Sequence, residues 1–313
     1  MKTTAAYRRG LRLTFALCLF VSAGCGGRTI GGGPSDGGLD PTDGTSPDGN
    51  ILLYDTFGQV WLSLWQESDP ANYNAGVNLV AAFFGEDYDP IFTMPGHLTT
   101  ENTPDGVTCD IYMRSGMLDP PEPDPPPQRD GGRISAWAGF DPGRLETVWI
   151  GSEYDVDYRW VDSPDWPAWI DSGAVAIQFE GEGSAYVDAF RTEVTLATVP
   201  EILAPPAADV PVPPDDEGNF LVSWASSPGL ADETLVTFEF NMDWDDSVFR
   251  CHPPVGYDHF LLPSDWVAEW SWGGGYMSVT HLNSEVLEMG ESRVTIRTLR
   301  TRRQFVSFGI YED

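Results

Sequence analysis

The chain of 313 residues contains 48 Asp and Glu against 17 Lys and Arg, which gives a formal net charge of −31. A surface this acidic repels phosphate backbones and anionic lipids, so the composition excludes nucleic acid as a partner and argues against electrostatic membrane binding. Hydrophobic residues make up 41% of the chain and aromatic residues 12%, which is ample for hydrophobic cores.

Residues 1–24 have the pattern of a secretory signal peptide. Four Lys and Arg residues precede an apolar run from Leu13 to Val21, and the small residues Ser22, Ala23 and Gly24 follow. The run is too short for a transmembrane helix, which needs roughly 20 apolar residues. Removal of this segment leaves 13 Lys and Arg against 48 Asp and Glu, a formal net charge of −35.

Cys25 directly follows the small residues, and Val-Ser-Ala-Gly-Cys resembles the lipobox of bacterial lipoproteins, with Ser22 where Leu is usual. The resemblance implies cleavage before Cys25 and acylation of its sulfur and of the new amino terminus. Two or three acyl chains hold a protein stably at a membrane, whereas one binds marginally. Gly26 at the next position implies sorting to the outer membrane of a Gram-negative cell. The alternative is an ordinary cleaved signal peptide followed by an unrelated Cys.

Residues 25–50 are rich in Gly, Asp and Pro and contain almost nothing apolar beyond Ile30. Such a segment cannot bury enough surface to offset its chain entropy, so we expect a disordered tether. At full extension it would span about 80 Å.

Short apolar runs bounded by turn residues follow over residues 51–199. In the first, Gly58 to Gln66, alternation places Val60, Leu62 and Leu64 on one face and Trp61, Ser63 and Trp65 on the other. Regular short strands with few helices predict an antiparallel β-sandwich domain. A proline-rich stretch, residues 118–132, is expected to form a loop outside the sheets. The other predicted strands of this half are residues 76–84, 107–113, 133–140, 145–151, 174–180 and 185–196.

Residues 200–218 are rich in Pro, Ala and acidic residues and are predicted to form a semi-rigid linker. Residues 219–313 then resemble an immunoglobulin or fibronectin-III β-sandwich, with Leu-Val-Ser-Trp at 221–224 similar to an early fibronectin-III strand. The predicted fold class is therefore mainly β, with two antiparallel β-sandwich domains. Ser264 to Trp270 is the one place where a helical turn competes with a strand. The predicted strands here are residues 219–225, 234–241, 247–251, 257–263, 276–282, 292–300 and 304–309.

Cys109 and Cys251 can pair in an oxidising compartment, and a disulfide between them would join the two halves. The alternative is two separate buried thiols, one in each core. The sequence leaves both open.

No cofactor or metal site is predicted. Cys251, His252 and His259 match no standard zinc spacing and supply too few ligands, and Asp243 to Asp246 or Asp155 and Asp157 would need further partners to hold Ca²⁺. The sequence has no Gly-x-Ser-x-Gly, P-loop or dinucleotide motif, so we do not predict an enzyme. Paired carboxylates for glycoside hydrolysis stay open, because a chain with this many acidic residues always offers pairs.

Aromatic and acidic side chains are interleaved between Tyr154 and Asp171. Flat rings stack on the apolar faces of sugars and carboxylates accept their hydroxyl protons, so this region is a candidate glycan site. The same composition also fills cores and solvates loops. The candidate ligand-binding residues are Tyr154, Tyr158, Trp160, Trp166 and Trp169.

Five arginines lie near the carboxyl end, and the alternation directs Arg293 and Arg297 away from Val294 and Ile296. They either pair with neighbouring carboxylates or form a dock for an anionic partner. Taken together, the sequence predicts an outer-membrane lipoprotein that acts as a non-catalytic interaction or structural module. Its expected partners are the membrane, through lipid at Cys25, and a glycan or an envelope protein. The alternatives are a glycan-binding module or carbohydrate-active enzyme and, more remotely, a calcium-dependent adhesin.

Overall fold

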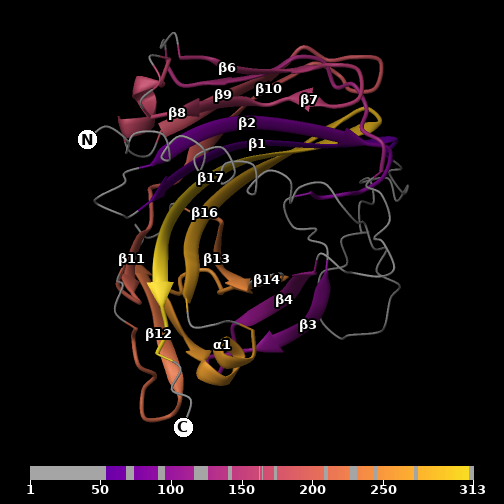
Figure 1. Cartoon of the computed structure of the whole chain (residues 1–313). Coiled ribbons are helices and arrows are strands. Elements are labelled where there is room, and N and C mark those ends of the chain that lie inside the picture. Colours follow the sequence, from indigo (N-terminus) through magenta and orange to yellow (C-terminus); the bar gives the residue numbers. More distant parts are fainter. Residues whose placement is uncertain are drawn as a thin grey trace, which may run out of the picture.

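The computed structural model describes residues 54–67, 74–90, 96–115, 126–139, 143–161, 163, 165–172, 175–207, 211–225, 231–242, 245–270 and 274–309. The signal peptide, Cys25, the predicted tether at 25–50 and residues 118–125 of the predicted proline-rich loop lie outside these ranges. The described part is mainly β, which confirms the predicted class (Figure 1).

Nine of the described strands form one large sheet, which bends strongly from β8 at one edge to β3 at the other (Figure 1). In spatial order these strands are β3 (His97–Asn102), β4 (Thr108–Ser115), β14 (Asp245–His252), β13 (Glu233–Met242), β16 (Gly274–Met289), β17 (Ser292–Ser307), β1 (Thr56–Glu67), β2 (Ala75–Phe84) and β8 (Asp157–Trp160).

The centre of this sheet is the hairpin of β16 and β17, two 16-residue strands. The strand β1 pairs with β17 in parallel over its whole length, from Thr56 opposite Ser292 to Glu67 opposite Arg303. The other strand pairs of the described residues are antiparallel. The sequence did not indicate that the first strand joins the last.

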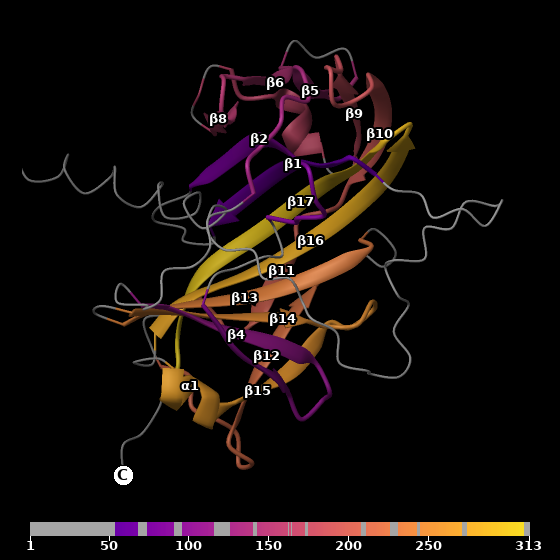
Figure 2. The ribbon, with the colours of Figure 1, turned by 90° about the vertical axis from the view of Figure 1, so that its right-hand side faces the viewer.

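Two smaller sheets pack against the outer side of the bend (Figures 1 and 2). One contains, in spatial order, β10 (Phe190–Leu196), β9 (Val175–Gly181), β5 (Ile134–Trp137), β6 (Leu145–Trp149) and β7 (Tyr154–Asp155), and the other contains β11 (Glu201–Ala204), β12 (Asn219–Ala225) and β15 (His259–Pro263). The helix α1 (Ser264–Trp270) follows β15, and a 3-10 helix, η2 (Ala168–Ser172), precedes β9.

Each small sheet encloses a hydrophobic core against the large one. Under the five-stranded sheet, Leu62, Leu79 and Ile296 of the large sheet pack with Phe179 and Ile177 of β9. Under the three-stranded sheet, the large sheet contributes aromatic side chains to a second core, which includes Phe238, Phe249, Phe220, Phe260 and Leu262. Burial of fully inaccessible Leu, Ile and Phe side chains stabilises a fold by roughly 1.5–3 kcal/mol each, so these two cores account for the layered packing.

Alternate residues of the large sheet face the inner side of the bend, because successive side chains of a strand point to opposite faces. Near β1 and β2 this inner face carries a third apolar cluster, which contains Trp61, Phe84, Leu282 and Leu299. Tyr88, from the segment after β2, packs on Phe84 with ring centroids 4.8 Å apart.

The sheets do not divide at the predicted linker. The large sheet takes strands from both sides of residues 200–218, and each core does the same. Residues within that segment are also attached to the body: β11 pairs with β12, and the Val212 amide donates to the Ser307 carbonyl at 2.9 Å. β11 thereby covers one edge of β12. The boundary at 200–218 therefore does not separate two independent sheets.

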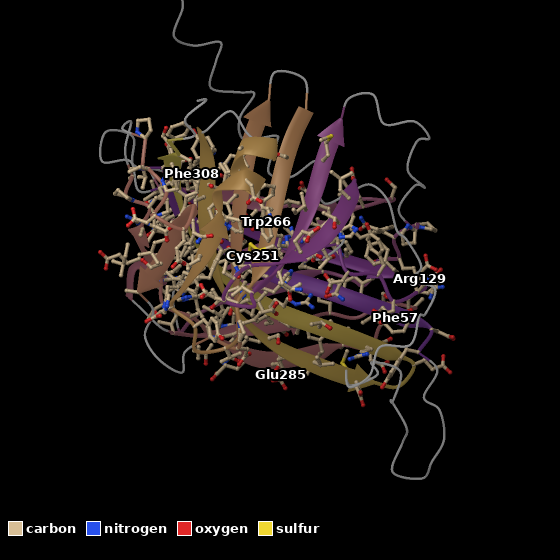
Figure 3. All side chains as sticks on the ribbon, turned by 90° about the horizontal axis from the view of Figure 1, so that it is seen from below. Phe57, Arg129, Cys251, Trp266, Glu285 and Phe308 are labelled. Carbon is tan, nitrogen blue, oxygen red and sulfur yellow. A yellow bond between two sulfur atoms is a disulfide. The ribbon has the colours of Figure 1, made fainter. Side chains whose placement is uncertain are left out.

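Cys109 and Cys251 face each other directly on β4 and β14 and form a disulfide (Figure 3). Both side chains are completely buried in the second core. Of the two arrangements that the sequence left open, the structure has the bonded one, and the bond joins residues 142 positions apart within one sheet.

Most predicted strands are present, with three differences. β3, β7, β8 and β11 were not predicted, because their short, polar or mixed sequences lack an apolar alternation. The runs at 292–300 and 304–309 belong to one strand, β17, which ends at Ser307, since Thr301 to Arg303 pair with β1 and β16 without a break. The competing helical turn at 264–270 is α1, and no helix in the described ranges is long and apolar enough to cross a membrane.

Candidate functional site

Three aromatic side chains gather on the inner face at the β8 edge of the large sheet. Trp65 comes from β1, and Tyr158 and Trp160 come from β8. The ring of Trp160 meets Trp65 edge-on, with centroids 5.5 Å apart and an interplanar angle of 85°, and meets Tyr158 in the same manner at 4.9 Å. We call these three residues the edge cluster.

Gly76 of β2 allows the edge cluster to form. It lies between the two tryptophans in the sheet, opposite Trp65 on one side and opposite Trp160 on the other. A Cβ atom at this position would lie 2.7 Å from Trp65 Nε1 and 2.8 Å from the Tyr158 hydroxyl, closer than real Cβ contacts. The rings of Trp65 and Tyr158 therefore occupy the space that a side chain at position 76 would need.

The edge cluster is held in one geometry by a hydrogen bond and by packing. The indole N–H of Trp65 donates to the Tyr158 hydroxyl. Burial raises the pKa of Tyr158 to about 12; the bond from Trp65 opposes this shift, and the negative charge of Glu67 adds to it. Tyr158 is thus a neutral hydroxyl at physiological pH, and its ring is fixed beside Trp160.

The cluster opens to solvent on its Trp160 side, where 42% of that residue is exposed. Two polar side chains lie at the same end of β1. The Asn74 side-chain amide donates to Oε2 of Glu67, the last residue of β1, at 2.7 Å. A rigid exposed ring with carboxylate and amide groups beside it can stack on a flat apolar ligand face and bond to its hydroxyl groups.

The other candidates in the 154–171 region lie elsewhere. Tyr154 is buried in the first core; its hydroxyl accepts from the Gly131 amide at 2.6 Å and donates to the Gly132 carbonyl at 3.0 Å. Trp169 is buried in the same core, and Trp166 packs against it. Of the five predicted residues, the structure brings only Tyr158 and Trp160 together on an open surface.

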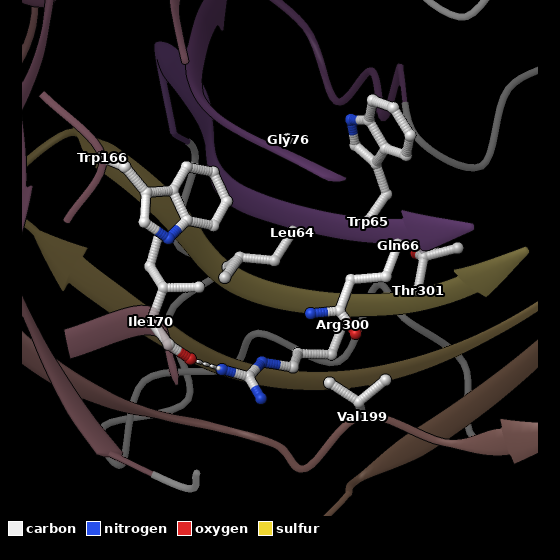
Figure 4. Close-up of a pocket in the computed structure, with 9 residues that line it drawn as sticks. All are labelled: Leu64, Trp65, Gln66, Gly76, Trp166, Ile170, Val199, Arg300 and Thr301. Atoms are coloured by element: carbon white, nitrogen blue, oxygen red, sulfur yellow. Dashed lines mark hydrogen bonds between the residues drawn. The ribbon is translucent and has the colours of Figure 1, made fainter. Parts of the chain in front are cut away.

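A small hollow lies behind the edge cluster, between β1, β17 and the segment around η2 (Figure 4). Its interior volume is about 10 Å³, which is room for about one water molecule. Trp166 and Arg300 stand on its wall, and Arg300 donates to the Ile170 carbonyl. Beside Arg300 on the neighbouring strand, His281 is buried, and this burial lowers its pKa. The hollow is too small for a sugar, so binding here would have to occur on the open face.

Four of the five arginines near the carboxyl end, Arg297, Arg300, Arg302 and Arg303, donate hydrogen bonds within the molecule. On the inner face, Arg297 donates to Asp89 at 2.7 Å and Arg303 donates to Glu239 at 2.7 Å. Arg300 lies on the outer side of the large sheet, where it donates to the Ile170 carbonyl. These contacts account for the alternation around Arg297 without an external anion.

Within the described ranges, no group of three or more His, Cys, Asp and Glu side chains is arranged to hold a metal ion. Asp157, one of the calcium candidates, is paired with Arg159 at 2.9 Å and accepts from the Glu146 amide. His252 lies 3.5 Å from Asp110 and 3.6 Å from Glu233. The side chains of Asp243 to Asp246 lie outside the description.

The sequence interpretation missed Trp65 and Gly76 as site residues. The alternation of β1 does place Trp65 on the face opposite Val60, Leu62 and Leu64, so a tryptophan on the face away from the core was a usable signal. The pairing of β2 with β8, which completes the cluster, leaves no mark in the sequence.

No protein-family model matches this chain, and no curated protein or solved structure is significantly similar to it.

Replacement of Gly76 by Ala should displace the Trp65 ring and break its bond to Tyr158, because the added methyl group has no space. Overpacking of this kind costs about 1–3 kcal/mol. Urea unfolding should detect the loss of stability, and near-UV circular dichroism should detect the changed aromatic packing. Gly274→Ala is the comparison variant, because its Cβ would lie 3.2 Å from the Phe305 ring, a tight contact that a small shift of this exposed ring relieves. A Gly76→Ala variant with unchanged stability and spectrum would contradict this description of the cluster.

Proposed function

We propose that this protein is an acylated, non-catalytic binding protein of the outer membrane, and that the edge cluster is its binding surface for a glycan. The anchor rests on the sequence alone: the charged start, the short apolar run and Val-Ser-Ala-Gly-Cys before the Gly-rich segment. The non-catalytic role is likewise a sequence argument, from the lack of recognisable catalytic motifs. The ligand class rests on the geometry of the edge cluster.

The path of the chain supports a binding surface held away from the anchor. The described body starts beside the turn of the β16–β17 hairpin, where the Asp55 and Thr56 amides donate to the Glu291 carbonyl. Trp65 lies nine residues after Thr56 on the extended strand β1, which is about 30 Å away. A tether attached at the hairpin turn would leave the edge cluster at the distant end of this strand.

One observation carries the glycan proposal: an exposed tryptophan that is already immobilised. Trp160 is 42% exposed although it contacts both Trp65 and Tyr158. A ring fixed in advance loses little conformational entropy when a ligand stacks on it. The apolar C–H face of a pyranose suits such a ring, and Glu67 and Asn74 can bond to the sugar hydroxyl groups. The strongly negative charge of the chain disfavours anionic ligands.

Replacement of Cys25 by Ala should release the protein from the membrane, because it removes the site of acylation. We expect the wild-type protein in the membrane pellet, resistant to high salt, and the variant in the soluble fraction. Mass spectrometry of the wild-type amino terminus should show acyl groups on Cys25. An unmodified Cys25, or a Cys25→Ala protein that stays in the pellet, would rule out the anchor.

Replacement of Trp160 by Ala should weaken retention on neutral glycans at least tenfold, since it removes the stacking surface and leaves both cores untouched. Glycan arrays and affinity electrophoresis in gels that contain polysaccharide measure this retention. Tyr257→Ala is the control, because Tyr257 is equally exposed, at 42%, and lies outside the cluster. If both variants bind glycans as the wild type does, the edge cluster is not a glycan site.

A further inference from the structure

The inner face carries a second aromatic cluster. Tyr276 of β16 and Phe305 of β17 lie directly opposite each other, with ring centroids 5.6 Å apart. The guanidinium of Arg303 lies over the Tyr276 ring at 4.1 Å and is bonded to Glu239. Phe305 is 44% exposed. As in the edge cluster, an exposed ring is fixed by its neighbours.

The strand register places both clusters on the same face of one sheet. Trp160, Gly76, Trp65, Thr301 and Thr280 form a single row across five adjacent strands. Phe305 follows Thr301 by four residues on β17, so it points to the same side.

The distance between the clusters follows from sheet geometry. Three strand spacings separate β8 from β17, about 14 Å, and four residues along β17 add about 13 Å. Trp160 and Phe305 are therefore about 20 Å apart across the sheet. The row that starts at Trp160 ends in two polar residues: the hydroxyl groups of Thr301 and Thr280 are bonded to each other at 2.9 Å, and both residues are half-buried.

We propose that the inner face binds a linear, neutral polysaccharide that lies across both clusters, with one sugar on Trp160 and another on Phe305. This inference rests on the proposed glycan function and specifies its ligand. Two stacking positions on one rigid sheet favour a long polysaccharide over a short one. Once one sugar is bound, the second position is occupied by the same molecule, so no further association from solution is needed. An open face of this length suits the side of a chain, whereas the water-sized hollow behind it admits no chain end.

Charge selects against acidic polysaccharides. The whole chain carries a formal net charge of −31, and the basic group nearest to Phe305 and Tyr276, Arg303, is already paired with Glu239. A uronic acid polymer would meet a repulsive field, and the described guanidinium beside these two rings is already engaged by a carboxylate. Uncharged hydroxyl groups can instead exchange hydrogen bonds with the threonines and with Glu67.

The test uses the full-length acylated protein in detergent and a panel of linear oligosaccharides, with calorimetric titration as the measurement. The panel contains β-1,4-glucan, β-1,3-glucan, mannan and chitin oligomers, each as disaccharide and hexasaccharide, and oligogalacturonates as acidic chains. We expect at least one neutral hexasaccharide to bind at least tenfold more tightly than its disaccharide, and the acidic hexamer to bind more weakly than this. In the Phe305→Ala variant the advantage of the hexasaccharide should disappear.

Two controls keep the outcome interpretable. Val286→Ala removes a side chain on the same face, 42% exposed but near the hairpin turn, and should change nothing. Phe305→Leu retains apolar volume without the flat ring, so it separates loss of stacking from loss of stability, which thermal unfolding monitors.

The results separate the two proposals. If binding depends on Trp160 but is independent of chain length and of Phe305, the extended site is wrong and the glycan function stands. A preference for acidic chains would also overturn the extended site. If no neutral oligosaccharide in the panel binds, both proposals fall.

Discussion

The parallel pairing of β1 with β17 is the interaction on which the rest of this structure depends. It joins the first described strand to the last over twelve residue pairs, and it closes a large sheet whose members come from both halves of the chain. Both main cores lie on the outer side of this sheet, one under each smaller sheet. Without β1 the first core loses Leu62 and Leu64, and β2 and β8 lose their attachment to the hairpin.

The difference in residue composition between the two faces of the large sheet follows from this arrangement. The two main cores take the apolar residues of the outer side, whereas the inner side carries the apolar cluster around Trp61 and Phe84 together with aromatic, hydroxyl and paired charged groups. The edge cluster and the pair of Tyr276 and Phe305 are precise because they stand on strands rather than on loops. A binding face built in this way needs no further folding step to present its rings.

The sequence predicted what depends on local alternation and failed where long-range pairing decides. The runs of β1, β2, β12 and β13 were found because apolar residues recur at every second position. β8 was taken only as a ligand region, since Asp-Tyr-Arg-Trp becomes a strand by pairing with β2. All five aromatic candidates lie in the same stretch of interleaved aromatic and acidic residues. The first core nevertheless covers three of them, Tyr154, Trp166 and Trp169, and leaves Tyr158 and Trp160 outside. Composition could not separate the two groups, because which side of a layer a ring occupies is set by the register.

The claim that both halves build one indivisible sheet is tested most directly by expression of residues 219–313 alone. This fragment lacks β1 and β4, so β17 and β14 lose a neighbouring strand and the second core loses Val107, Cys109 and Ile111. The account predicts that its thermal unfolding shows no cooperative transition and that its amide proton spectrum is poorly dispersed. A cooperative transition with a well-dispersed spectrum would show that this half folds independently, and would contradict the account.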